Sequence, residues 1–560
     1  MSERIFIGVA WPYASGPLHV GHVAGAYLPA DIFARYHRTK GNEVIMVSGS
    51  DQHGTPITIK AEQEGKKPAE VVAYFHQIFL DSWKKLGISW DLFTTTGTQN
   101  HARVSQDIFL TLLKKGYIYK ETVSQPYCPK CQRFLPDRYV EGTCPHCQYP
   151  GARGDQCEAC GKPLNPQDLI GFRCRICGTA PVFKDTEHFF LKLSAFNDRL
   201  LTWIRKQTHW RQNVTNFVEH YLEDGLKDRA ITRDIEWGIP IPLEGYEGKR
   251  LYVWFEAVIG YLSAAIEWAS YQDDKEKWRA FWQDKNTKSY YFIGKDNIPF
   301  HALIWPAMLM GYDETLNLPF DIPANEFLTI EGKKISTSRN WAIWLPDYLS
   351  RYDPEPLRYL LSINMPETSD TDFSWREFVR RNNDELVATY GNLAHRVLTF
   401  TYKNFDGSVP QPGEMDSQDK TILDMAHSAI KATDEMLYCC HFRDAIRSAM
   451  ALAQETNRYL DRKAPWKAIK ENRQAAATSL HVALTVLSAL STMLYPFLPF
   501  SSQKLWEFLG FKDTVQEGGW RLHTPPAGQK LLLPQPLFSK LDDETIEEES
   551  KRLGQEYRSG

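Results

Sequence analysis

Hydrophobic positions follow two different periods along the chain. Up to about residue 118, short apolar runs alternate with helical patterns, as at residues 5–13 (IFIGVAWPY) and 43–48 (EVIMVS). Such runs, separated by polar loops and helices, predict the strands of a parallel α/β sheet. A second stretch of this kind lies at residues 251–309, where we predict a strand at 290–294 (YYFIG) and the start of a helix at 299–309.

From about residue 381 onward the apolar spacing is helical. Within residues 421–440, positions three and four apart fall near one face: Ile422, Ala426, Ala429, Thr433, Met436 and Leu437. Several such segments predict an α-helical bundle. Residues 546–560 are charged and fit either a terminal helix or a solvated tail.

One apolar stretch, residues 480–500, is long enough to span a bilayer and holds no Lys, Arg, Asp or Glu. Because His481, Pro496 and Pro499 interrupt it, a buried bundle helix that ends at the prolines is the favoured interpretation. The N-terminus lacks the pattern of a secretion signal, so we expect a cytoplasmic protein without a membrane segment.

The bulk composition is that of a globular protein with more than one domain. The chain has 560 residues, 43% of them hydrophobic and 24% charged, and a formal net charge of −4. This balance excludes attraction of a polyanion by the field of the whole protein. Any nucleic-acid binding must therefore use local basic patches.

Eight of the ten cysteines form four Cys-x-x-Cys pairs: Cys128/Cys131, Cys144/Cys147, Cys157/Cys160 and Cys174/Cys177. Clustered pairs on tight turns predict zinc knuckles, in an insert rather than in the sheet. Eight ligands suffice for two sites, either nested, with the middle two pairs sharing one zinc, or paired in sequence. Sites made of four thiolates are structural, since they leave no open position. Cys439 and Cys440 are predicted to be buried apolar side chains.

The stretch PLHVGH (residues 17–22) follows the first predicted strand and sets two histidines three residues apart. We expect Pro17 at the first helical position, with His19 and His22 on one face of the first turn. A helix N-terminus with two imidazoles suits a phosphate group. A metal-binding pair or two ordinary surface histidines are the alternatives.

The stretch EGKKISTS (residues 331–338) pairs with HVGH, and together they resemble the HIGH and KMSKS motifs of class I aminoacyl-tRNA synthetases. Further stretches, in the same order, resemble the methionyl-tRNA synthetase family: AWPYASGPLHVGH, SGSDQHGTP, the Cys-x-x-Cys insert, EHFFLKL, LYVWFEAVIGY, FIGKDN, FHALIWPAML and NRYLDRKAPW. The resemblance covers residues 4 to about 540, and the several knuckles and KISTS are closer to the archaeal type.

This resemblance implies an α/β fold: a Rossmann-like, parallel-sheet catalytic domain split by a zinc-binding insert, then an α-helical bundle that binds the anticodon. The implied boundaries are 1–118 and 250–325 for the catalytic halves, 119–249 for the connective insert with knuckles at 128–177, 326–380 for a stem-contact region with the KISTS loop, 381–545 for the anticodon domain and 546–560 for the tail.

The implied reaction joins methionine to ATP, giving methionyl-adenylate and pyrophosphate, and then transfers the methionyl group to the 3′ end of tRNA(Met). By the same resemblance, His19, His22 and Lys334 are catalytic, and ATP is bound by His19, Gly21, His22, Lys334, Ser336 and Thr337, together with Mg²⁺. Thr337 stands where the family's second lysine usually lies, and Lys333 is the nearest candidate to supply the missing charge.

For methionine, the resemblance assigns the α-ammonium to Asp51. The remaining pocket positions are Trp11, Tyr13, Trp254, Ala257, Tyr261, Phe300 and His301. Aromatic rings suit a thioether, and Tyr261 is the candidate for a polar contact to the sulfur. For tRNA, Trp466 is expected to stack on an anticodon base with Asn392, Arg396 and Pro465 beside it, inside the basic stretch 457–470.

Three alternatives remain open. Synthetases for leucine, isoleucine or valine carry a large editing insert, for which the stretch between HVGH and KISTS has no room. A cysteine-specific relative uses a catalytic zinc, which four-thiolate sites disfavour. A non-catalytic tRNA-binding scaffold is the alternative from another class, favoured only by Thr337. Because the chain has no additional C-terminal dimerisation module, we expect a monomer.

Overall fold

Five strands form the sheet at the centre of the α/β part, in the order β14-β13-β1-β2-β3. Every neighbouring pair runs parallel. Their bounds are Arg4–Val9 (β1), Glu43–Ser50 (β2), Leu92–Thr95 (β3), Lys288–Gly294 (β13) and Ala324–Asn325 (β14). The structure, a computed structural model, describes residues 2–555 except 137–138, 155–156, 158, 161–163 and 165. The predicted parallel α/β sheet is confirmed.

The chain crosses from β1 to β2 on one side and to β13 on the other, so the strand order reverses at β1. In open parallel sheets, such a reversal leaves a crevice beyond the carboxyl ends of the strands, where ligands bind. The helices of this part flank the sheet and its crevice. They are α1 (Val20–His22), α2 (Leu28–Thr39), α3 (Thr55–Glu64), α4 (Pro68–Leu86), α5 (Gln99–Lys114), α8 (Val253–Glu256), α9 (Gly260–Ser270), α10 (Trp278–Trp282) and α11 (Trp305–Tyr312).

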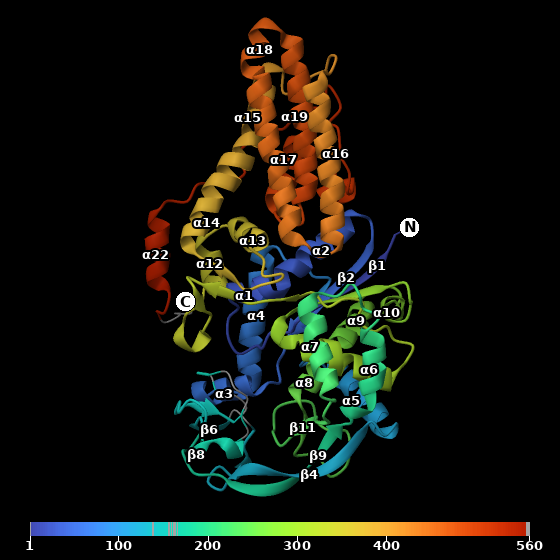
Figure 1. Cartoon of the computed structure of the whole chain (residues 1–560), viewed down its shortest axis with the longest axis vertical. Coiled ribbons are helices and arrows are strands. Elements are labelled where there is room, and N and C mark those ends of the chain that lie inside the picture. Colours follow the sequence, from blue (N-terminus) through green and yellow to red (C-terminus); the bar gives the residue numbers. More distant parts are fainter. Residues whose placement is uncertain are drawn as a thin grey trace.

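The cysteine-rich segment is an insert between β3 and β13 and takes no part in the central sheet, as predicted. A long antiparallel pair, β4 (Ile118–Cys128) and β9 (Val182–Leu191), carries it away from the α/β part (Figure 1). Its other elements are β5 (Arg133–Phe134), β6 (Val140–Thr143), β7 (Ala152–Arg153), β8 (Ile170–Cys174), β10 (Arg229–Ala230), β11 (Thr232–Arg233), β12 (Arg250–Leu251), α6 (Asn197–Ile204) and α7 (Gln212–Glu223).

A short region after β14 links the sheet to the helical part. It holds a three-stranded sheet of β15 (Leu328–Ile330), β16 (Lys333–Lys334) and β17 (Thr371–Phe373). The helices α12 (Leu345–Arg351) and α13 (Pro354–Ile363) lie between β16 and β17 in the chain. The buried guanidinium of Arg358 on α13 donates to Asp31 on α2 and to the carbonyls of Pro496 and Phe497. This residue therefore joins the α/β part to the helices beyond it.

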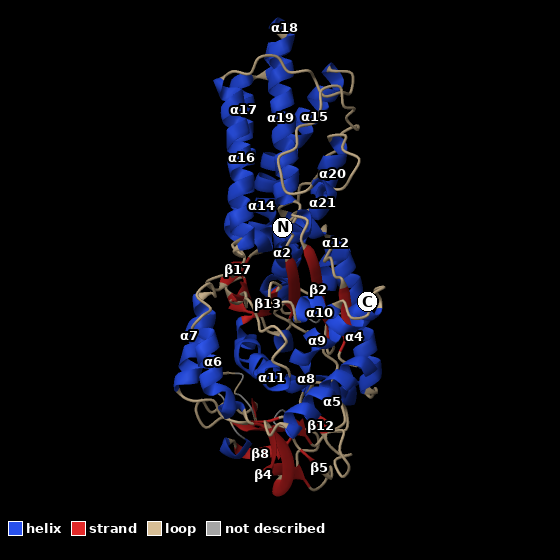
Figure 2. Ribbon diagram, turned by 90° about the vertical axis from the view of Figure 1, so that its right-hand side faces the viewer, coloured by secondary structure: helices blue, strands red, loops and turns tan. Residues whose placement is uncertain are grey.

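Long helices form the other end of the molecule (Figures 1 and 2). They are α14 (Trp375–Arg381), α15 (Asn392–Asn404), α16 (Ser417–Tyr438), α17 (Phe442–Lys463), α18 (Pro465–Glu471), α19 (Arg473–Leu494), α20 (Pro499–Phe508) and α21 (Val515–Gly518). Within the described residues, α19 alone has the length and hydropathy of a membrane span, and its most apolar window is entirely buried inside the structure. The prediction of a buried bundle helix ending before Pro496 is confirmed.

The predicted face of α16 packs on the core: Ile422, Ala426, Thr433 and Leu437 are buried together with Ile430, and Ala429 and Met436 are half-buried against it. One detail of the helical prediction is wrong. Cys440 is buried as predicted, but Cys439 is exposed because α16 ends there. The charged C-terminal stretch forms a helix, α22 (Glu544–Arg552), which packs against α14 and pairs Glu549 with Arg351 of α12. Residues 556–560 lie outside the described residues.

Candidate active site

A cavity of about 750 Å³ lies at the carboxyl ends of β1, β2 and β13. It is lined by every residue that the sequence assigned to catalysis, ATP or methionine: Trp11, Tyr13, His19, Gly21, His22, Asp51, Trp254, Ala257, Tyr261, Phe300, His301, Lys334, Ser336 and Thr337. A concave site of this volume is typical for a small-molecule ligand. The structure therefore brings together residues that lie far apart in the sequence.

The HVGH stretch begins its helix later than predicted. Pro17 is not helical; α1 starts at Val20, with His19 as its N-cap. The reason is that residues 18–20 are held in extended pairing: Val20 N–H donates to the carbonyl of Ile343 at 3.0 Å, and Leu345 N–H donates to the carbonyl of Leu18 at 2.7 Å. The segment after the KISTS loop thus fixes where this helix can start.

The two histidines do share a face, as predicted. Their rings stack with centroids 3.7 Å apart, and His22 Nδ1 accepts the backbone N–H of His19 at 3.2 Å. Desolvation lowers the pKa of His22 to about 4 and that of His19 well below its usual value, so both rings are neutral at pH 7. Neutral His22 then carries its proton on Nε2. His19 Nδ1 is buried and has no hydrogen-bond partner among the described residues.

The KISTS loop (residues 334–338) closes one side of the cavity. Lys334, Ile335, Ser336 and Thr337 all line it. Successive strand residues point to opposite faces, and Lys333 accordingly lies outside the cavity, with its ammonium 4.3 Å from the ring centroid of Trp341. Lys334, and not Lys333, is therefore the lysine of this segment that lines the cavity.

Asp51 follows β2 and is buried in the cavity wall. Its Oδ1 accepts the backbone N–H of His53 at 3.2 Å. Burial and the neighbouring carboxylate of Glu256 raise the pKa of Asp51 well above its usual value. A carboxyl group in such a setting gains its charge most readily when a cation binds beside it.

Tyr261 and His301 form a buried pair at the inner end of the cavity, with the hydroxyl 2.7 Å from His301 Nε2. His301 Nδ1 lies 2.9 Å from the carbonyl of Asn297 and must donate to it. Since desolvation lowers the pKa of His301 to about 4, the ring is neutral and Nε2 accepts. The proton of Tyr261 is thus committed to His301 and not free for a contact to sulfur.

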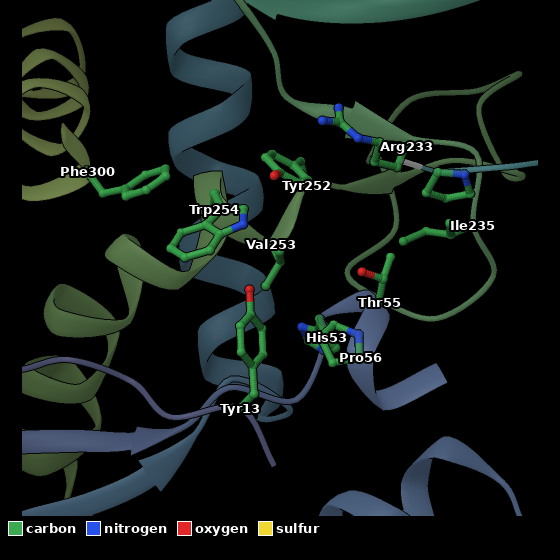
Figure 3. Close-up of a pocket in the computed structure, with 11 residues that line it drawn as sticks. Tyr13, His53, Thr55, Pro56, Arg233, Ile235, Tyr252, Val253, Trp254 and Phe300 are labelled. Atoms are coloured by element: carbon green, nitrogen blue, oxygen red, sulfur yellow. The ribbon is translucent and has the colours of Figure 1, made fainter. Parts of the chain in front are cut away.

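Aromatic rings separate this cavity from a second one of about 280 Å³ (Figure 3). Trp254 stacks on Phe300 with centroids 4.2 Å apart, and Tyr13 meets Trp254 edge-on at 6.2 Å. All three rings line both cavities. In Figure 3, Tyr13 points toward Trp254, so these side chains form the partition.

The eight paired cysteines form two tetrads in the nested arrangement: Cys128, Cys131, Cys174 and Cys177, and Cys144, Cys147, Cys157 and Cys160. Within each tetrad all sulfur atoms lie within 4.8 Å of one another, and Cys128 and Cys177 are 3.4 Å apart. Tetrahedral zinc with bonds near 2.3 Å requires separations of roughly 3.8 Å. The donor sets fit zinc, and the sequential pairing is wrong.

The predicted anticodon residues gather at the tip of the bundle, where α18 lies far from the cavity (Figure 1). The guanidinium of Arg396 lies 4.6 Å from the ring centroid of Trp466 and donates to Asn457 at 3.2 Å. Pro465 is the first residue of α18, after Ala464 in the left-handed region at φ 39°. Asn392 is exposed one turn before Arg396 on α15.

Comparison with protein families identifies both the part of the chain that holds the cavity and the helical part. Residues 5–398 match the family described as tRNA synthetases class I (M), and residues 409–557 match the anticodon binding domain of methionyl tRNA ligase. This chain belongs to the methionyl class I tRNA synthetases. The resemblance drawn from HVGH, KISTS and the further stretches is confirmed, and with it the enzyme class, a ligase.

Individual relatives agree with this membership of the synthetase family. The chain is 64% identical to the methionine–tRNA ligase of Dehalococcoides mccartyi, over 99% of this chain and 100% of that one. It is 55% identical to the same enzyme of Thermomicrobium roseum, over 99% of each chain. Mycobacterium tuberculosis methionyl-tRNA synthetase in complex with methionyl-adenylate superimposes with a TM-score of 0.79 at 26% identity, covering 96% and 100%.

Sequence reasoning missed several residues of the synthetase cavity. Asp296 and Asn297 line it from the turn after β13, and Glu326 and Phe327 from the segment after β14. The stretch FIGKDN had marked the first pair, since polar residues directly after a buried strand lie at the carboxyl edge of the sheet. The stretch LYVWFEAVIGY had included Glu256, a buried residue behind the cavity wall, but its contacts arise only in the folded chain.

Proposed function

We propose that the residues of the 750 Å³ cavity carry out methionine activation and transfer. The methionine carboxylate attacks the α-phosphate of ATP, which forms a carboxyl–phosphate bond and releases pyrophosphate. A hydroxyl of the tRNA 3′-terminal adenosine then attacks the methionyl carbonyl and releases AMP. These steps need positioned groups and charge stabilisation, and no covalent protein nucleophile. The gathering of all the assigned side chains in one cavity is the observation that carries this proposal.

His19, His22 and Lys334 hold the phosphates. The Nε2–H of neutral His22 can donate to a phosphate oxygen, and so can the unpartnered Nδ1 of His19 in the tautomer that carries the proton there. Lys334 on the exposed β16 turn supplies positive charge opposite them. Gly21, Ser336 and Thr337 line the remaining ATP side, and Ile335 fills the space over the Gly21 backbone.

Asp51 pairs with the methionine ammonium. Its buried carboxylate gains a cation that offsets the cost of ionising it there. Trp11, Tyr13, Trp254, Ala257, Tyr261, Phe300 and His301 enclose the side chain. Contacts between sulfur and aromatic rings contribute about 0.3–1.5 kcal/mol each, which favours methionine over an alkyl side chain of the same shape.

The tip of the bundle reads the anticodon of tRNA(Met). Trp466 offers a ring face for stacking and Arg396 a cation, with Asn392 and Pro465 beside them. We assign residues 381–545 to this domain, residues 326–380 to contact with the stem of the L-shaped tRNA, and the split catalytic domain to 1–118 and 250–325, with the connective insert at 119–249.

Zinc and magnesium complete the proposed enzyme. The two tetrads would each hold one structural Zn²⁺, which supplies the cohesion that the small insert core lacks. Mg²⁺ would enter with ATP and neutralise phosphate charge; Asp296 on the cavity wall offers the carboxylate oxygen that this ion prefers. We propose a cytoplasmic monomer.

Charging of tRNA(Met) transcripts with radioactive methionine tests the proposal. The wild type should form methionyl-tRNA, and His22→Ala should lose at least 100-fold in rate while its affinity for tRNA stays within twofold. Binding of tRNA without any charging by the wild type would instead identify a non-catalytic tRNA-binding scaffold.

A further inference from the structure

A fully buried carboxylate, Glu256, lies beside the methionine site without lining its cavity. It ends α8, two residues after Trp254 and directly before Ala257. Its Oε1 lies 2.7 Å from Nδ1 of His53, and its Oε2 lies 2.6 Å from Nε2 of His101. Both oxygens are therefore occupied by imidazoles that come from separate parts of the chain.

On one side this cluster reaches Asp51. His53 lies two residues after Asp51, and its backbone N–H donates to Asp51 Oδ1 at 3.2 Å. The ring of His53 is fixed by Glu256 and also lines the smaller cavity beside Tyr13 (Figure 3). Glu256 thus holds the side chain of the residue whose backbone N–H orients the carboxylate of Asp51.

On the other side the cluster reaches the pocket for the methionine side chain. His101 on α5 contacts the hydroxyl of Ser263 on α9 through Nδ1, at 2.8 Å. Ser263 in turn donates to the carbonyl of Gly260, next to Tyr261. Glu256 thus connects the loop that carries Asp51 to the helices that carry the inner end of the pocket.

The carboxylates of Glu256 and Asp51 favour binding of a cation beside Asp51. Burial alone would raise the pKa of Glu256, but His53 and His101 lower it to about 2, so Glu256 stays ionised. Its negative charge lies close enough to Asp51 to oppose ionisation of that residue. Glu256 and Asp51 together raise the pKa of His53, and an incoming ammonium group supplies the further positive charge that offsets ionisation of Asp51.

We propose that Glu256 is a positioning residue for the α-ammonium of the amino acid, holding His53 and His101 so that the Asp51 carboxylate faces the incoming group. This inference rests on the proposed role of Asp51. Glu256 does not line the cavity and connects only to residues on the amino-acid side, so we expect its effect there. The ATP side, built from HVGH and KISTS, has no contact with this cluster among the described residues.

Steady-state ATP–pyrophosphate exchange with Glu256→Gln tests the proposal. The amide keeps the shape of the side chain but removes its charge and one acceptor. We expect the KM for methionine to rise at least tenfold, with the KM for ATP within twofold and kcat within threefold. Inhibition by L-methioninol, which keeps the ammonium, should weaken by the same factor, and inhibition by 4-(methylsulfanyl)butan-1-ol, which lacks it, should not change.

Glu355→Gln is the matched control, because Glu355 is also a buried carboxylate but accepts the backbone N–H groups of Phe500 and Ser501 away from the cavity. It should leave the KM for methionine unchanged. If the KM for methionine and the KM for ATP rise equally in Glu256→Gln, the proposal is overturned, because the substitution then disturbs the structure as a whole. The same conclusion follows if Glu355→Gln raises the KM for methionine as much as Glu256→Gln does. An unchanged KM for methionine would overturn it as well.

If Glu256→Gln does not fold, His101→Gln removes only one of the two bonds to Glu256 and should raise the KM for methionine about threefold, with the KM for ATP unchanged; no rise would overturn the proposal. Asp51→Asn separates this inference from the proposed function. A normal KM for methionine in Asp51→Asn contradicts the ammonium site itself. A raised KM there with a normal one in Glu256→Gln contradicts only the role of Glu256.

Discussion

Ile335 of the KISTS loop lies directly over Gly21 of HVGH. A Cβ atom at residue 21 would lie 2.6 Å from Cδ1 of Ile335 and 3.0 Å from the ring of His19. The two motifs are thus in contact across the cavity, and the glycine permits this close approach. A side chain at residue 21 must displace the Ile335 side chain, the His19 ring or both.

Gly21→Ala is therefore expected to impair ATP use more than stability. Displacing Ile335 moves Lys334 away from the phosphates, and we expect kcat/KM for ATP in pyrophosphate exchange to fall at least tenfold, or about 1.4 kcal/mol. Adding Ile335→Val, which removes the clashing Cδ1, should restore part of this loss. Gly16→Ala serves as control, since nothing lies within 4 Å of a Cβ there; an equal loss in that variant would contradict the contact argument.

His301 makes the stability of the protein depend on pH. Its pKa is lowered from 6.5 to about 4 in the folded protein, so the unfolded chain binds the proton more strongly between these values. The contribution of His301 to the free energy of unfolding is fully present above pH 6.5 and is lost as the pH falls toward 4. At pH 5 the loss is about 2 kcal/mol. The melting temperature should therefore fall less from pH 7 to pH 5 in His301→Gln than in the wild type. Equal falls in both proteins would refute this assignment.

Metal analysis should find two zinc ions per chain. Cys131→Ser and Cys147→Ser each remove one ligand from a different tetrad, so each variant should retain about one zinc, because a site with three thiolates binds far more weakly. Cys439→Ser, at an exposed cysteine outside both tetrads, should retain two. A wild-type protein with no zinc after purification without chelators would contradict the structural-zinc proposal.

Trp466→Ala should weaken tRNA recognition and leave activation intact. Stacking of a base on an aromatic ring contributes about 1–3 kcal/mol, so we expect kcat/KM for tRNA(Met) to fall roughly 5- to 150-fold. Methionine-dependent pyrophosphate exchange should stay within twofold. Phe405→Ala removes a similar pair in the same bundle, in which Arg473 lies 4.7 Å from the ring, and should leave both activities unchanged. Loss of pyrophosphate exchange in Trp466→Ala would instead show that Trp466 is needed for folding.

Local patterns and motifs were enough to predict the parallel sheet, the insert and the bundle, and the family resemblance supplied many of the cavity residues. The β-branched run at residues 43–48 lies in β2, and the nested tetrads follow from the Cys-x-x-Cys spacing with one alternative left open. These features depend on residues near one another in the chain, or on a motif order shared with a family.

Features that depend on contacts between distant segments were not predictable. Pro17 stays outside α1 because residues 343–345 pair with residues 18–20, and neither stretch specifies the other. The commitment of the Tyr261 proton to His301 depends on the carbonyl of Asn297. The bonds of Glu256 to His53 and His101 likewise join three segments, and a single buried glutamate gives no pattern in a sequence.

Methionine-dependent exchange of pyrophosphate into ATP tests the central claim most directly. The wild type should exchange label with methionine and at least 100-fold less with leucine or isoleucine, since the proposed aromatic pocket distinguishes the side chains before tRNA is involved. His22→Ala should lose the exchange while remaining folded. Exchange with no amino acid, or equal exchange with leucine and methionine, would contradict the account.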